Sequence, residues 1–353
     1  MAAPKTLRWG ILSTARIGRK VWPSILLSGN GVVAAVASRD RAKAQAFIDE
    51  NQAANPFPEA PRAIGSYEEL LAAKDIDAVY VPLPTGIRRQ WLIAAAAAGK
   101  HVVSEKPSAA SLFDLQAILD ACEHHGVQYM DGVMFMHGPR LQLLREALDD
   151  GRAFGELRRV TSTFSFCGDH AFLEKDIRLD SSMEPLGCLG DLGWYCVRFS
   201  LWAGKWALPR TVKGRILRSA RRADAAGSDQ VPLAFSGELL FDGWSAAFYC
   251  SFDSHLQNWA YVEGTAGIVR LEDFAFQQTG RRAQFWKGTE PIATDQYGDP
   301  HPKGQATHLY RTFAGLVLSG RRDPFWPEVS WKTQRVLDAC LRSAQTGADA
   351  ALG

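Results

Sequence analysis

The sequence lacks the long apolar runs that mark membrane proteins. Its longest apolar stretch is WLIAAAAAG at 91–99, whereas a helix needs about 20 apolar residues to span a bilayer. The N-terminal segment MAAPKTLRWG also lacks the apolar core of a secretory signal peptide. We therefore expect a cytoplasmic protein with no membrane partner.

The sequence also lacks cysteine and histidine motifs. None of its six cysteines are spaced as C-x-x-C, which favours reduced core thiols over a disulfide framework or a zinc site. The eight histidines show no metal-ligand spacing, so we predict no metal. His137 and His170 stand alone. Isolated histidines are more often structural than functional, so these two are the weaker candidates for contact with a substrate.

Charge of one sign is not concentrated anywhere in the chain. The net charge is +2 and the basic residues are dispersed, which argues against nucleic acid as a partner. The sequence has no Walker-type phosphate loop and no nucleophile elbow. Its content of 46% hydrophobic and 22% charged residues is ordinary for a globular enzyme.

The length of the chain indicates two domains, because 353 residues exceed what one hydrophobic core usually supports. In the first domain, residues 1–131, short apolar runs alternate with helical patterns. The expected strands are 7–13, 32–38, 78–83, 101–106 and 127–135. Strands that are apolar throughout and are followed by helices predict a doubly wound α/β Rossmann domain with a parallel sheet.

The second domain, residues 132–353, follows a different pattern. Strand-like segments cover 156–166, 210–217, 233–252 and 258–274, and helices are expected at 188–204, 305–319 and 330–345. This predicts an α+β domain with a large, mostly antiparallel, open-faced sheet. If helices cover only one face of this sheet, its other face is too apolar for a monomer to expose to solvent. We therefore expect a homodimer or higher oligomer through the open face.

A short turn follows the first expected strand and precedes a helix. In STARIG, the three glycine positions of G-x-G-x-x-G are taken by Ser13, Ala15 and Gly18. Free backbone N–H groups and the helix dipole hold a pyrophosphate at such a turn. Serine and alanine are small enough for close approach unless the position requires a positive φ. The residues expected to contact a dinucleotide here are Ser13, Thr14, Ala15, Arg16 and Ile17.

The end of the second strand indicates which dinucleotide binds. A carboxylate about 20 residues after the turn usually holds the ribose of NAD, whereas a 2′-phosphate needs a cation or a hydroxyl. Ser38 and Arg39 stand at this edge, and Asp40 is better placed to cap the next helix. We therefore expect NADP. NAD remains the alternative cofactor, and a solvated surface charge is the alternative reading of Arg39.

The segment GDLGWYCVRF at 190–199 places an acid and a phenol in an apolar stretch. Asp191 and Tyr195 are four residues apart, so they share one face of a helix. Taken alone, the pair fits a tyrosine hydroxyl that satisfies a buried carboxylate. A further polar group, Lys106, ends the strand HVVSEK. The carboxyl ends of such strands border the ligand crevice, so we expect Lys106 to lie there.

A series of segments in order along nearly the whole chain carries a family resemblance. They are WGILSTARIG, VASRD, AVYVPLPTGIRRQW, AAAAGKHVVSEKP, DGVMFMHGPR, GCLGDLGWY, EGTAGIVRLEDF and TQRVLDA. Together they resemble the glucose–fructose oxidoreductase / inositol dehydrogenase (Gfo/Idh/MocA) family. The most specific of them is the block Glu105-Lys106-Pro107. Tyrosine four residues after Asp191 resembles the branch that contains dimeric dihydrodiol dehydrogenase.

The resemblance implies contacts to the nicotinamide end of the cofactor. Members use a strand-edge Pro-x-Pro segment and a glutamate–lysine pair, and the matching positions here are Leu83, Thr85, Arg88, Glu105 and Lys106. The family commonly has asparagine and histidine where Thr85 and Arg88 stand. It often carries tyrosine, arginine and histidine where this chain has Phe135, Met136 and Gly138, so we expect no matching substrate contacts from that segment.

The resemblance also implies that Lys106 hydrogen-bonds the reacting oxygen and that Asp191 and Tyr195 belong to the same site. An unperturbed tyrosine, with a pKa of about 10, is a poor base at neutral pH. An ammonium within roughly 4–6 Å favours the phenolate, so we expect Lys106 to lower the pKa of Tyr195. Asp191 would orient Lys106 or a second substrate hydroxyl. Arg178 and Trp194 are candidates for substrate contact, with a surface ion pair and a buried core indole as the alternatives.

These expectations lead to one function and two alternatives. The leading function is an NADP-dependent oxidoreductase that transfers a hydride between the nicotinamide and a CH–OH or carbonyl group of a sugar, cyclic polyol or dihydrodiol. The alternatives are a tightly bound cofactor recycled between two sugars, and a non-catalytic NADP-binding sensor that regulates a partner protein. Lys106, Asp191 and Tyr195 favour the enzyme, because a sensor has no physical need for them.

Overall fold

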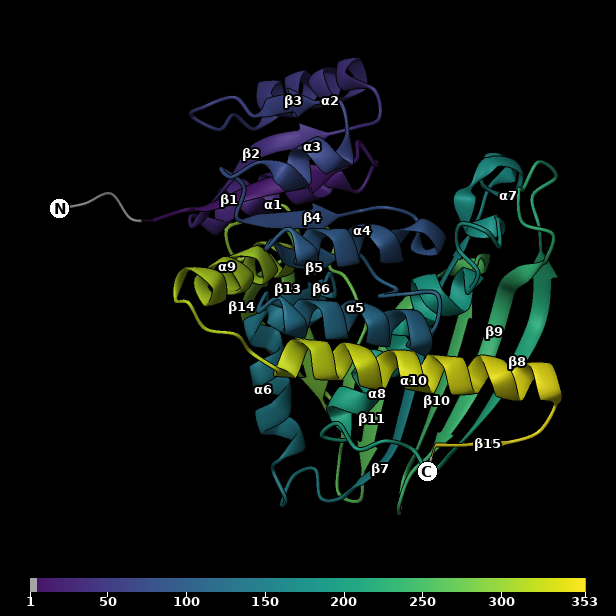
Figure 1. The fold of residues 1–353 in the computed structure, drawn as a ribbon. Helices are drawn as coiled ribbons and strands as arrows, with labels where there is room; N and C mark the ends of the chain where they lie inside the picture. Colours follow the sequence, from purple (N-terminus) through teal and green to yellow (C-terminus); the bar gives the residue numbers. More distant parts are fainter. Residues whose placement is uncertain (1–4, 353) are drawn as a thin grey trace.

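A computed structural model of the chain describes residues 5–352 and contains two sheets (Figure 1). The first has six parallel strands in the order β3-β2-β1-β4-β5-β6. They are β1 (Leu7–Leu12), β2 (Gly31–Ala37), β3 (Arg62–Ile64), β4 (Ala78–Val81), β5 (His101–Ser104) and β6 (Tyr129–Asp131). This is the strand order of a doubly wound dinucleotide-binding domain, and it reverses between β1 and β4.

Helices connect these strands, and side-chain caps set where three of them begin. They are α1 (Gly18–Ser28), α2 (Arg41–Ala54), α3 (Tyr67–Ala72), α4 (Thr85–Ala97) and α5 (Leu112–His124). Asp40 accepts hydrogen bonds from the backbone N–H groups of Ala42 and Lys43, and Ser66 accepts one from Glu69. Ser111 caps α5 in the same way. Asp40 therefore caps α2, as its position after the second strand predicted.

The second sheet has nine strands in the order β14-β13-β12-β11-β7-β10-β9-β8-β15. It is antiparallel except where β7 and β10 pair in parallel. The strands are β7 (Leu157–Cys167), β8 (Thr211–Ala220), β9 (Val231–Leu240), β10 (Ser245–Ser251), β11 (Asp253–Gly264), β12 (Ile268–Leu271), β13 (Arg282–Lys287), β14 (Glu290–Tyr297) and β15 (Ala350–Ala351). The predicted fold class is confirmed.

The described part of the second half, up to residue 352, also contains five α-helices and three short helical turns. The helices are α6 (Pro139–Leu148), α7 (His170–Lys175), α8 (Trp194–Ala203), α9 (Gln305–Leu318) and α10 (Phe325–Thr346). Met134–His137 and Ile177–Leu179 form 3₁₀ turns, and Leu189–Gly193 forms a π-helical turn. The sequence did not predict α6, α7, β13 or β14.

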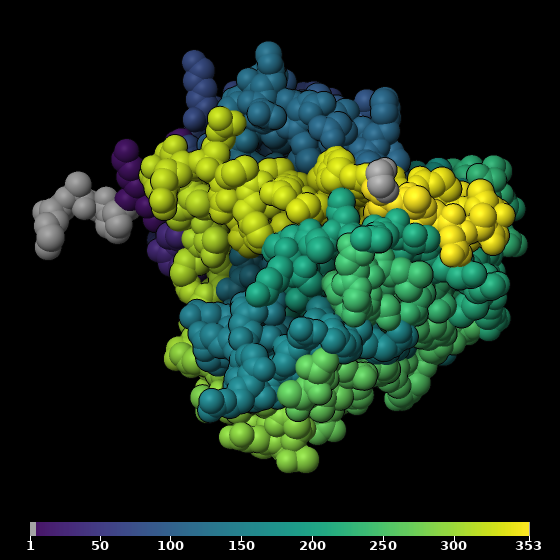
Figure 2. Space-filling model, turned by 90° about the horizontal axis from the view of Figure 1, so that it is seen from below, coloured from purple at the N-terminus to yellow at the C-terminus, as the bar shows by residue number. Residues whose placement is uncertain are grey.

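The last two helices return to the first domain. Helix α9 packs against α1 and β1, where the Trp9 ring contacts Tyr310 and Phe313 at centroid distances of 5.4 and 5.2 Å. Helix α10 lies beside α5 and crosses to β8 (Figure 1). In Figure 2 the two helices form a yellow band between the blue first domain and the green second domain. The chain's C-terminal part therefore joins the two halves.

Two properties of the described chain bear on function. Among residues 5–352, none of the helices combines the length and the apolar character needed to cross a membrane. In the same part of the chain, no group of three or more His, Cys, Asp or Glu side chains is arranged to hold a metal ion. The six cysteines are free thiols, and all except Cys167 are buried.

Candidate active site

Polar side chains from both halves meet beyond the carboxyl end of β5. Lys106, just after β5, donates a hydrogen bond from Nζ to the Asp191 carboxylate and another, of 2.7 Å, to the Asp191 backbone oxygen. The second carboxylate oxygen of Asp191 accepts from Arg178 Nε at 2.9 Å. The Lys106 and Asp191 side chains are 13% and 15% exposed. Asp191 therefore bridges two cations within reach of solvent.

The charge state of Asp191 follows from these partners. Burial raises the pKa of its carboxyl, but the charges and hydrogen bonds of Arg178 and Lys106 outweigh burial and bring this pKa to about 2. Asp191 is therefore ionised at neutral pH and fixes the Lys106 ammonium. This is one of the two arrangements that the sequence suggested for Asp191.

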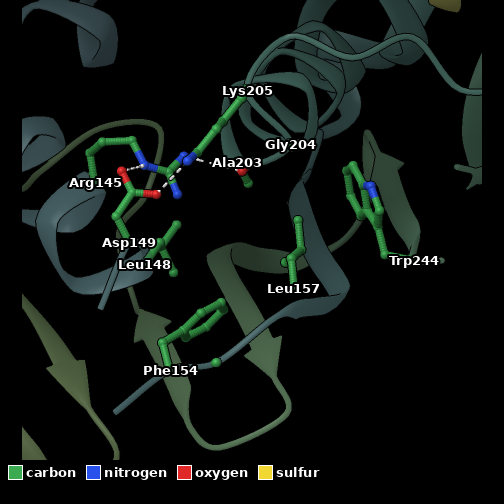
Figure 3. Close-up of a pocket in the computed structure, with 10 residues that line it drawn as sticks. Arg145, Leu148, Asp149, Phe154, Leu157, Ala203, Gly204, Lys205 and Trp244 are labelled. Carbon is green, nitrogen blue, oxygen red and sulfur yellow. Dashed lines mark hydrogen bonds and ion pairs between the residues drawn. The ribbon is translucent and has the colours of Figure 1, made fainter. Parts of the chain in front are cut away.

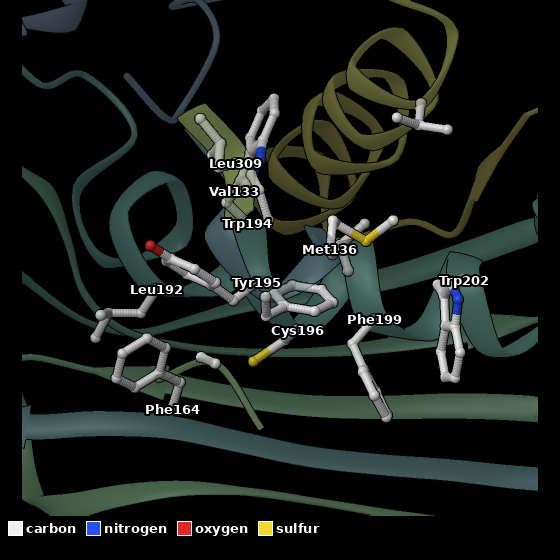
Figure 4. Close-up of a cluster of buried hydrophobic side chains, with 14 of the residues drawn as sticks. Val133, Met136, Phe164, Leu192, Trp194, Tyr195, Cys196, Phe199, Trp202 and Leu309 are labelled. Carbon is white, nitrogen blue, oxygen red and sulfur yellow. The ribbon is translucent and has the colours of Figure 1, made fainter. Parts of the chain in front are cut away.

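Tyr195 lies next to this network in a largely apolar environment. Its side chain is buried, its ring meets Phe164 edge-on at 5.4 Å, and its hydroxyl donates to Met134 Sδ at 3.5 Å. Figure 4 shows Tyr195 and Phe164 in this buried cluster. The hydroxyl lies against sulfur, a weak acceptor, rather than against Asp191. The interpretation of the phenol as a cap for that carboxylate is therefore wrong.

The expected lowering of the Tyr195 pKa by Lys106 is also wrong. Lys106 Nζ lies 5.1 Å from the centre of the Tyr195 ring, but its hydrogen bonds go to Asp191. Burial raises the pKa of Tyr195 well above its ordinary value, and the negative charges of Glu105, Asp191 and Asp131 raise it further. Tyr195 is therefore a neutral phenol that can donate a proton at physiological pH.

The backbone around Asp191 is wound as a π turn over Leu189–Gly193 instead of the predicted α-helix. Such turns often occur at functional sites. A Cβ atom on Gly190 would lie 2.7 Å from Leu186 Cβ and 3.2 Å from Pro107 Cγ. Glycine at this position therefore lets the π turn approach the segment that carries Lys106.

Thr85 and Arg88 were predicted to contact the cofactor, but their polar atoms are used inside the protein. Arg88 is 3% exposed, and its guanidinium donates to the backbone oxygens of Leu83, Glu105 and Pro107. The Thr85 hydroxyl donates to Glu184 (2.5 Å). These two residues therefore shape the strand ends around Lys106 rather than offering free groups to a ligand.

Glu105 is also held by protein groups. The Tyr80 hydroxyl donates to its Oε1 at 2.5 Å, and the Lys106 backbone N–H donates to its Oε2 at 3.2 Å. Leu83 is buried. Glu105 and Leu83 remain candidates for contact with the nicotinamide, since both stand at the carboxyl ends of strands where doubly wound domains bind ligands.

The turn after β1 leads directly into α1. Ser13 has a φ of 128°, a conformation that favours glycine and costs a serine about 1–3 kcal/mol. Serine was expected to fit the first glycine position of the motif if that position does not require a positive φ. Position 13 does have a positive φ, so Ser13 is strained. The Ser13 hydroxyl accepts the Ala15 N–H at 3.2 Å. Arg16 and Ile17 are exposed, and Thr14 continues the turn. Strained backbone of this kind clusters at ligand sites.

The edge beyond β2 carries an exposed cation. Arg39 is exposed and Ser38 is buried, with its hydroxyl accepting the Asp40 N–H at 3.3 Å. Since β1 and β2 are paired neighbours, Arg16 and Arg39 follow adjacent strand ends. Within residues 5–352, neither guanidinium forms an ion pair with a carboxylate. Both are therefore available to an anionic ligand.

The remaining candidates fall into two groups. Arg178 belongs to the site through Asp191, whereas Trp194 is 0% exposed and packs in the core (Figure 4). Trp194 therefore has no accessible ring face on which a sugar could stack. It is a buried core indole, which was the alternative interpretation. The His137 ring stacks on a buried tryptophan, and burial lowers its pKa to about 3. His170 is exposed and pairs with Glu174.

Sequence reasoning missed a buried ion pair that holds α8 in place. Arg198 Nη2 lies 2.5 Å from Asp131 Oδ2, and the side chains are 0% and 1% exposed. Arg198 also donates to the Thr333 hydroxyl at 2.6 Å. Since Asp131 ends β6 and Arg198 follows Tyr195 by one helical turn, the pair fixes Tyr195 relative to the parallel sheet. The signal was an arginine inside the apolar run WYCVRF.

A cavity of about 330 Å³ lies elsewhere in the second domain. Figure 3 shows the Arg145–Asp149 pair, Lys205 and Trp244 around it. None of the residues that line it is among the predicted site residues. This cavity is therefore separate from the candidate active site.

Comparisons with known proteins agree with this architecture. Residues 7–133 match the oxidoreductase family with an NAD-binding Rossmann fold (Gfo/Idh/MocA), and residues 141–270 match the Gfo/Idh/MocA C-terminal domain. A D-xylose 1-dehydrogenase (NADP⁺) of Haloferax volcanii is 33% identical over 97% of this chain and 98% of its own length. The mouse trans-1,2-dihydrobenzene-1,2-diol dehydrogenase is 31% identical over 75% of this chain and 74% of its own length.

A solved structure shows the same fold. The aldose–aldose oxidoreductase from Caulobacter crescentus superposes with a TM-score of 0.83 at 24% identity, covering 99% of this chain and 100% of that one. The family matches and the xylose dehydrogenase span both halves described above, including Lys106, Asp191 and Tyr195. The chain therefore belongs to the Gfo/Idh/MocA family of oxidoreductases.

Proposed function

We propose that this protein is an NADP-dependent oxidoreductase that interconverts a CH–OH group and a carbonyl in a sugar, cyclic polyol or dihydrodiol. The observation that carries the proposal is the meeting of Lys106 and Tyr195 at the carboxyl edge of a dinucleotide-type sheet. Lys106 comes from one half and Tyr195 from the other. A substrate oxygen between them would contact both a cation and a phenol.

The hydrogen bonds of Lys106 leave it able to bind a substrate. An ammonium has three donors, and two of them are used on Asp191. The third would bind the reacting oxygen. When bound, NADP supplies or accepts the hydride at its nicotinamide ring. In the reduction direction, the Tyr195 O–H gives its proton to the carbonyl oxygen. In the oxidation direction, the Tyr195 phenolate accepts the proton of the substrate hydroxyl.

The cofactor and substrate class are supported by the relatives and by charge. The Haloferax volcanii relative is named as an NADP⁺ enzyme acting on D-xylose, and the mouse relative as a dihydrodiol dehydrogenase. Arg16 and Arg39 are exposed beside adjacent strand ends, where a 2′-phosphate would meet them. We therefore favour NADP and a substrate with neighbouring hydroxyl groups.

The test is the absorbance at 340 nm after mixing protein and NADP with a panel of aldoses, inositols and diols. A rise with at least one compound is expected. A flat response with bound cofactor would overturn the proposal and favour the sensor. Transfer between two aldoses without added cofactor, by protein that retains NADP through dialysis, would show the recycling alternative instead.

We also propose a cytoplasmic homodimer formed through the second sheet. Along β11, the buried Ala260 and Val262 alternate with the half-buried Trp259 and Tyr261, whose rings lie 4.9 Å apart. Helices α8 and α10 pack against this sheet, on the side of the buried residues. The opposite face carries Trp259 and Tyr261, with Tyr249 two strands away on β10. An aromatic face of this kind favours association with a second copy.

A further inference from the structure

A segment of the second domain covers the first turn of a helix in the first domain. Helix α4 begins at Thr85, after Pro84, which provides no side-chain cap. The Thr85 N–H donates to Glu184 Oε1 at 3.0 Å, and the Gly86 N–H donates to the Met183 backbone oxygen at 2.8 Å. The first N–H groups of a helix have no acceptor within it. The second domain therefore supplies the cap that α4 lacks.

The Glu184 carboxylate uses both oxygens in this contact. Its Oε2 accepts the Thr85 hydroxyl at 2.5 Å while its Oε1 accepts the Thr85 N–H. Burial raises the pKa of Glu184 above its ordinary value, with a further contribution from the Asp191 charge, although the Arg88 charge and the Thr85 hydrogen bonds act in the opposite direction. Two hydrogen bonds to one residue fix the carboxylate in orientation as well as in position. The contact is therefore more specific than a cap by a loop carbonyl.

The segment around Glu184 is itself anchored in the second domain. Asp180 is 0% exposed, and its Oδ1 accepts from the Ser182 N–H, the Ser182 hydroxyl and the Gly227 N–H at 3.0, 2.7 and 3.1 Å. A Cβ on Gly86 would lie 2.0 Å from the Ser182 backbone oxygen. The segment is thus rigid at one end and in close contact with α4 at the other.

Each end of this contact leads to the candidate active site. On the α4 side, Arg88 lies one turn after Thr85 and holds the carbonyls of Glu105 and Pro107, which flank Lys106. On the other side, the segment lies between Arg178 and Asp191 in the chain. The Thr85–Glu184 contact therefore connects the Arg178–Asp191 segment to α4, and through Arg88 to the backbone on both sides of Lys106.

We propose that Glu184 is a positioning residue, which sets the distance between the Lys106 strand end and the Arg178–Asp191 segment. This rests on the proposed function. Glu184 does not touch the reacting atoms in this proposal and acts through Thr85. Hydride transfer requires close alignment, and a misplacement of about 1 Å can lower the rate about 100-fold. The link is therefore expected to affect turnover more than cofactor binding.

The test combines amide exchange with kinetics in the full-length protein. In Glu184→Ala, exchange of the Thr85 and Gly86 N–H groups is expected to be faster, and kcat is expected to fall about 10- to 100-fold, with the Kd of NADP within about twofold of wild type. Thr85→Val keeps the side-chain shape but removes the hydroxyl bond, and it should show a smaller fall in kcat. Thr85→Ser restores the hydroxyl and should restore kcat.

The control is Glu59→Ala, since Glu59 is exposed in the connection after α2 and should leave both measurements unchanged. If the Thr85 and Gly86 N–H groups exchange in Glu184→Ala as slowly as in wild type, the Thr85–Glu184 contact would be refuted. A kcat within twofold of wild type in both Glu184→Ala and Thr85→Val, or a loss in Thr85→Val that Thr85→Ser fails to restore, would overturn the positioning role. A wild-type protein inactive on the whole panel would refute the proposed function instead, and the exchange result would still decide the contact.

Discussion

Lys106 Nζ lies over the face of the Tyr195 ring, 5.1 Å from its centre, while its hydrogen bonds go to Asp191. The cation is thus neutralised by a carboxylate that itself has Arg178 as a second partner. Burial, together with the charges of Glu105, Asp191 and Asp131, raises the pKa of the phenol well above its ordinary value, so the phenol stays protonated. A protonated phenol at this position is what the proposed reaction needs as its proton donor, and the first two predictions follow from it.

Removing the phenol hydroxyl should stop turnover without affecting cofactor binding. Tyr195→Phe is expected to lower kcat by about 10²–10⁴, the range for a lost acid–base group, with NADP affinity by fluorescence titration unchanged. Tyr297→Phe is the matched control, because Tyr297 stacks on His301 in the second sheet, apart from the site. Full turnover by Tyr195→Phe would contradict the assigned role.

The two directions of the reaction should respond differently to pH. The pKa of Tyr195 is raised well above its ordinary value. Below that pKa nearly all of the phenol is protonated, and the small fraction of phenolate increases about tenfold per pH unit. Reduction should therefore be nearly constant from pH 6 to 9, while oxidation should keep rising. The measurement is kcat/KM in both directions over this range. A plateau of the oxidation rate below pH 8 would show that the phenol ionises easily after all.

The choice between cofactors should depend on Arg39. Charge-assisted hydrogen bonds contribute about 1.5–3 kcal/mol, so Arg39→Ala is expected to raise the Kd of NADP about tenfold or more and to leave that of NAD unchanged. Calorimetric titration with both dinucleotides measures this. Lys74→Ala, at another exposed cation, serves as the control. An equal loss for both cofactors would contradict a specific contact with the 2′-phosphate.

The buried pair Arg198–Asp131 should matter for stability. Removing one partner leaves an uncompensated buried charge, so Arg198→Met is expected to lower the free energy of unfolding by about 3–5 kcal/mol. The double variant Arg198→Met/Asp131→Leu should recover much of this loss. Denaturant unfolding monitored by tryptophan fluorescence measures both. Equal destabilisation by the single and double variants would show that the charge pair is not the cause.

The oligomeric state should depend on the outer face of the second sheet. Trp259→Arg places a charge on the aromatic face and is expected to convert the dimer into a monomer of unchanged fold. Sedimentation velocity at micromolar concentration and circular dichroism check the two parts of this statement. A wild-type protein that sediments as a monomer would remove the proposed interface.

The sequence by itself determined five of the six strands of the first sheet and missed its edge strand β3, which has only three residues. Apolar runs and caps such as Asp40 and Ser66 act within a few residues, so their outcome can be inferred from local patterns. The polar pair β13 and β14 and the short helix α7 were missed, since their apolar patterns are weak and their place depends on the neighbouring strands. The spacing of Asp191 and Tyr195 identified the segment that meets Lys106, but the sequence did not predict its π turn.

Only the tertiary structure decided what the site residues do. The pKa of Tyr195 depends on burial and on Glu105 and Asp131, which lie far away in sequence. The guanidinium of Arg88 is used on backbone oxygens, and Thr85 meets Glu184 across the two halves of the molecule. Electrostatic and hydrogen-bonding roles depend on distances of a few ångströms between segments remote in the chain, whereas secondary structure depends on neighbours along it.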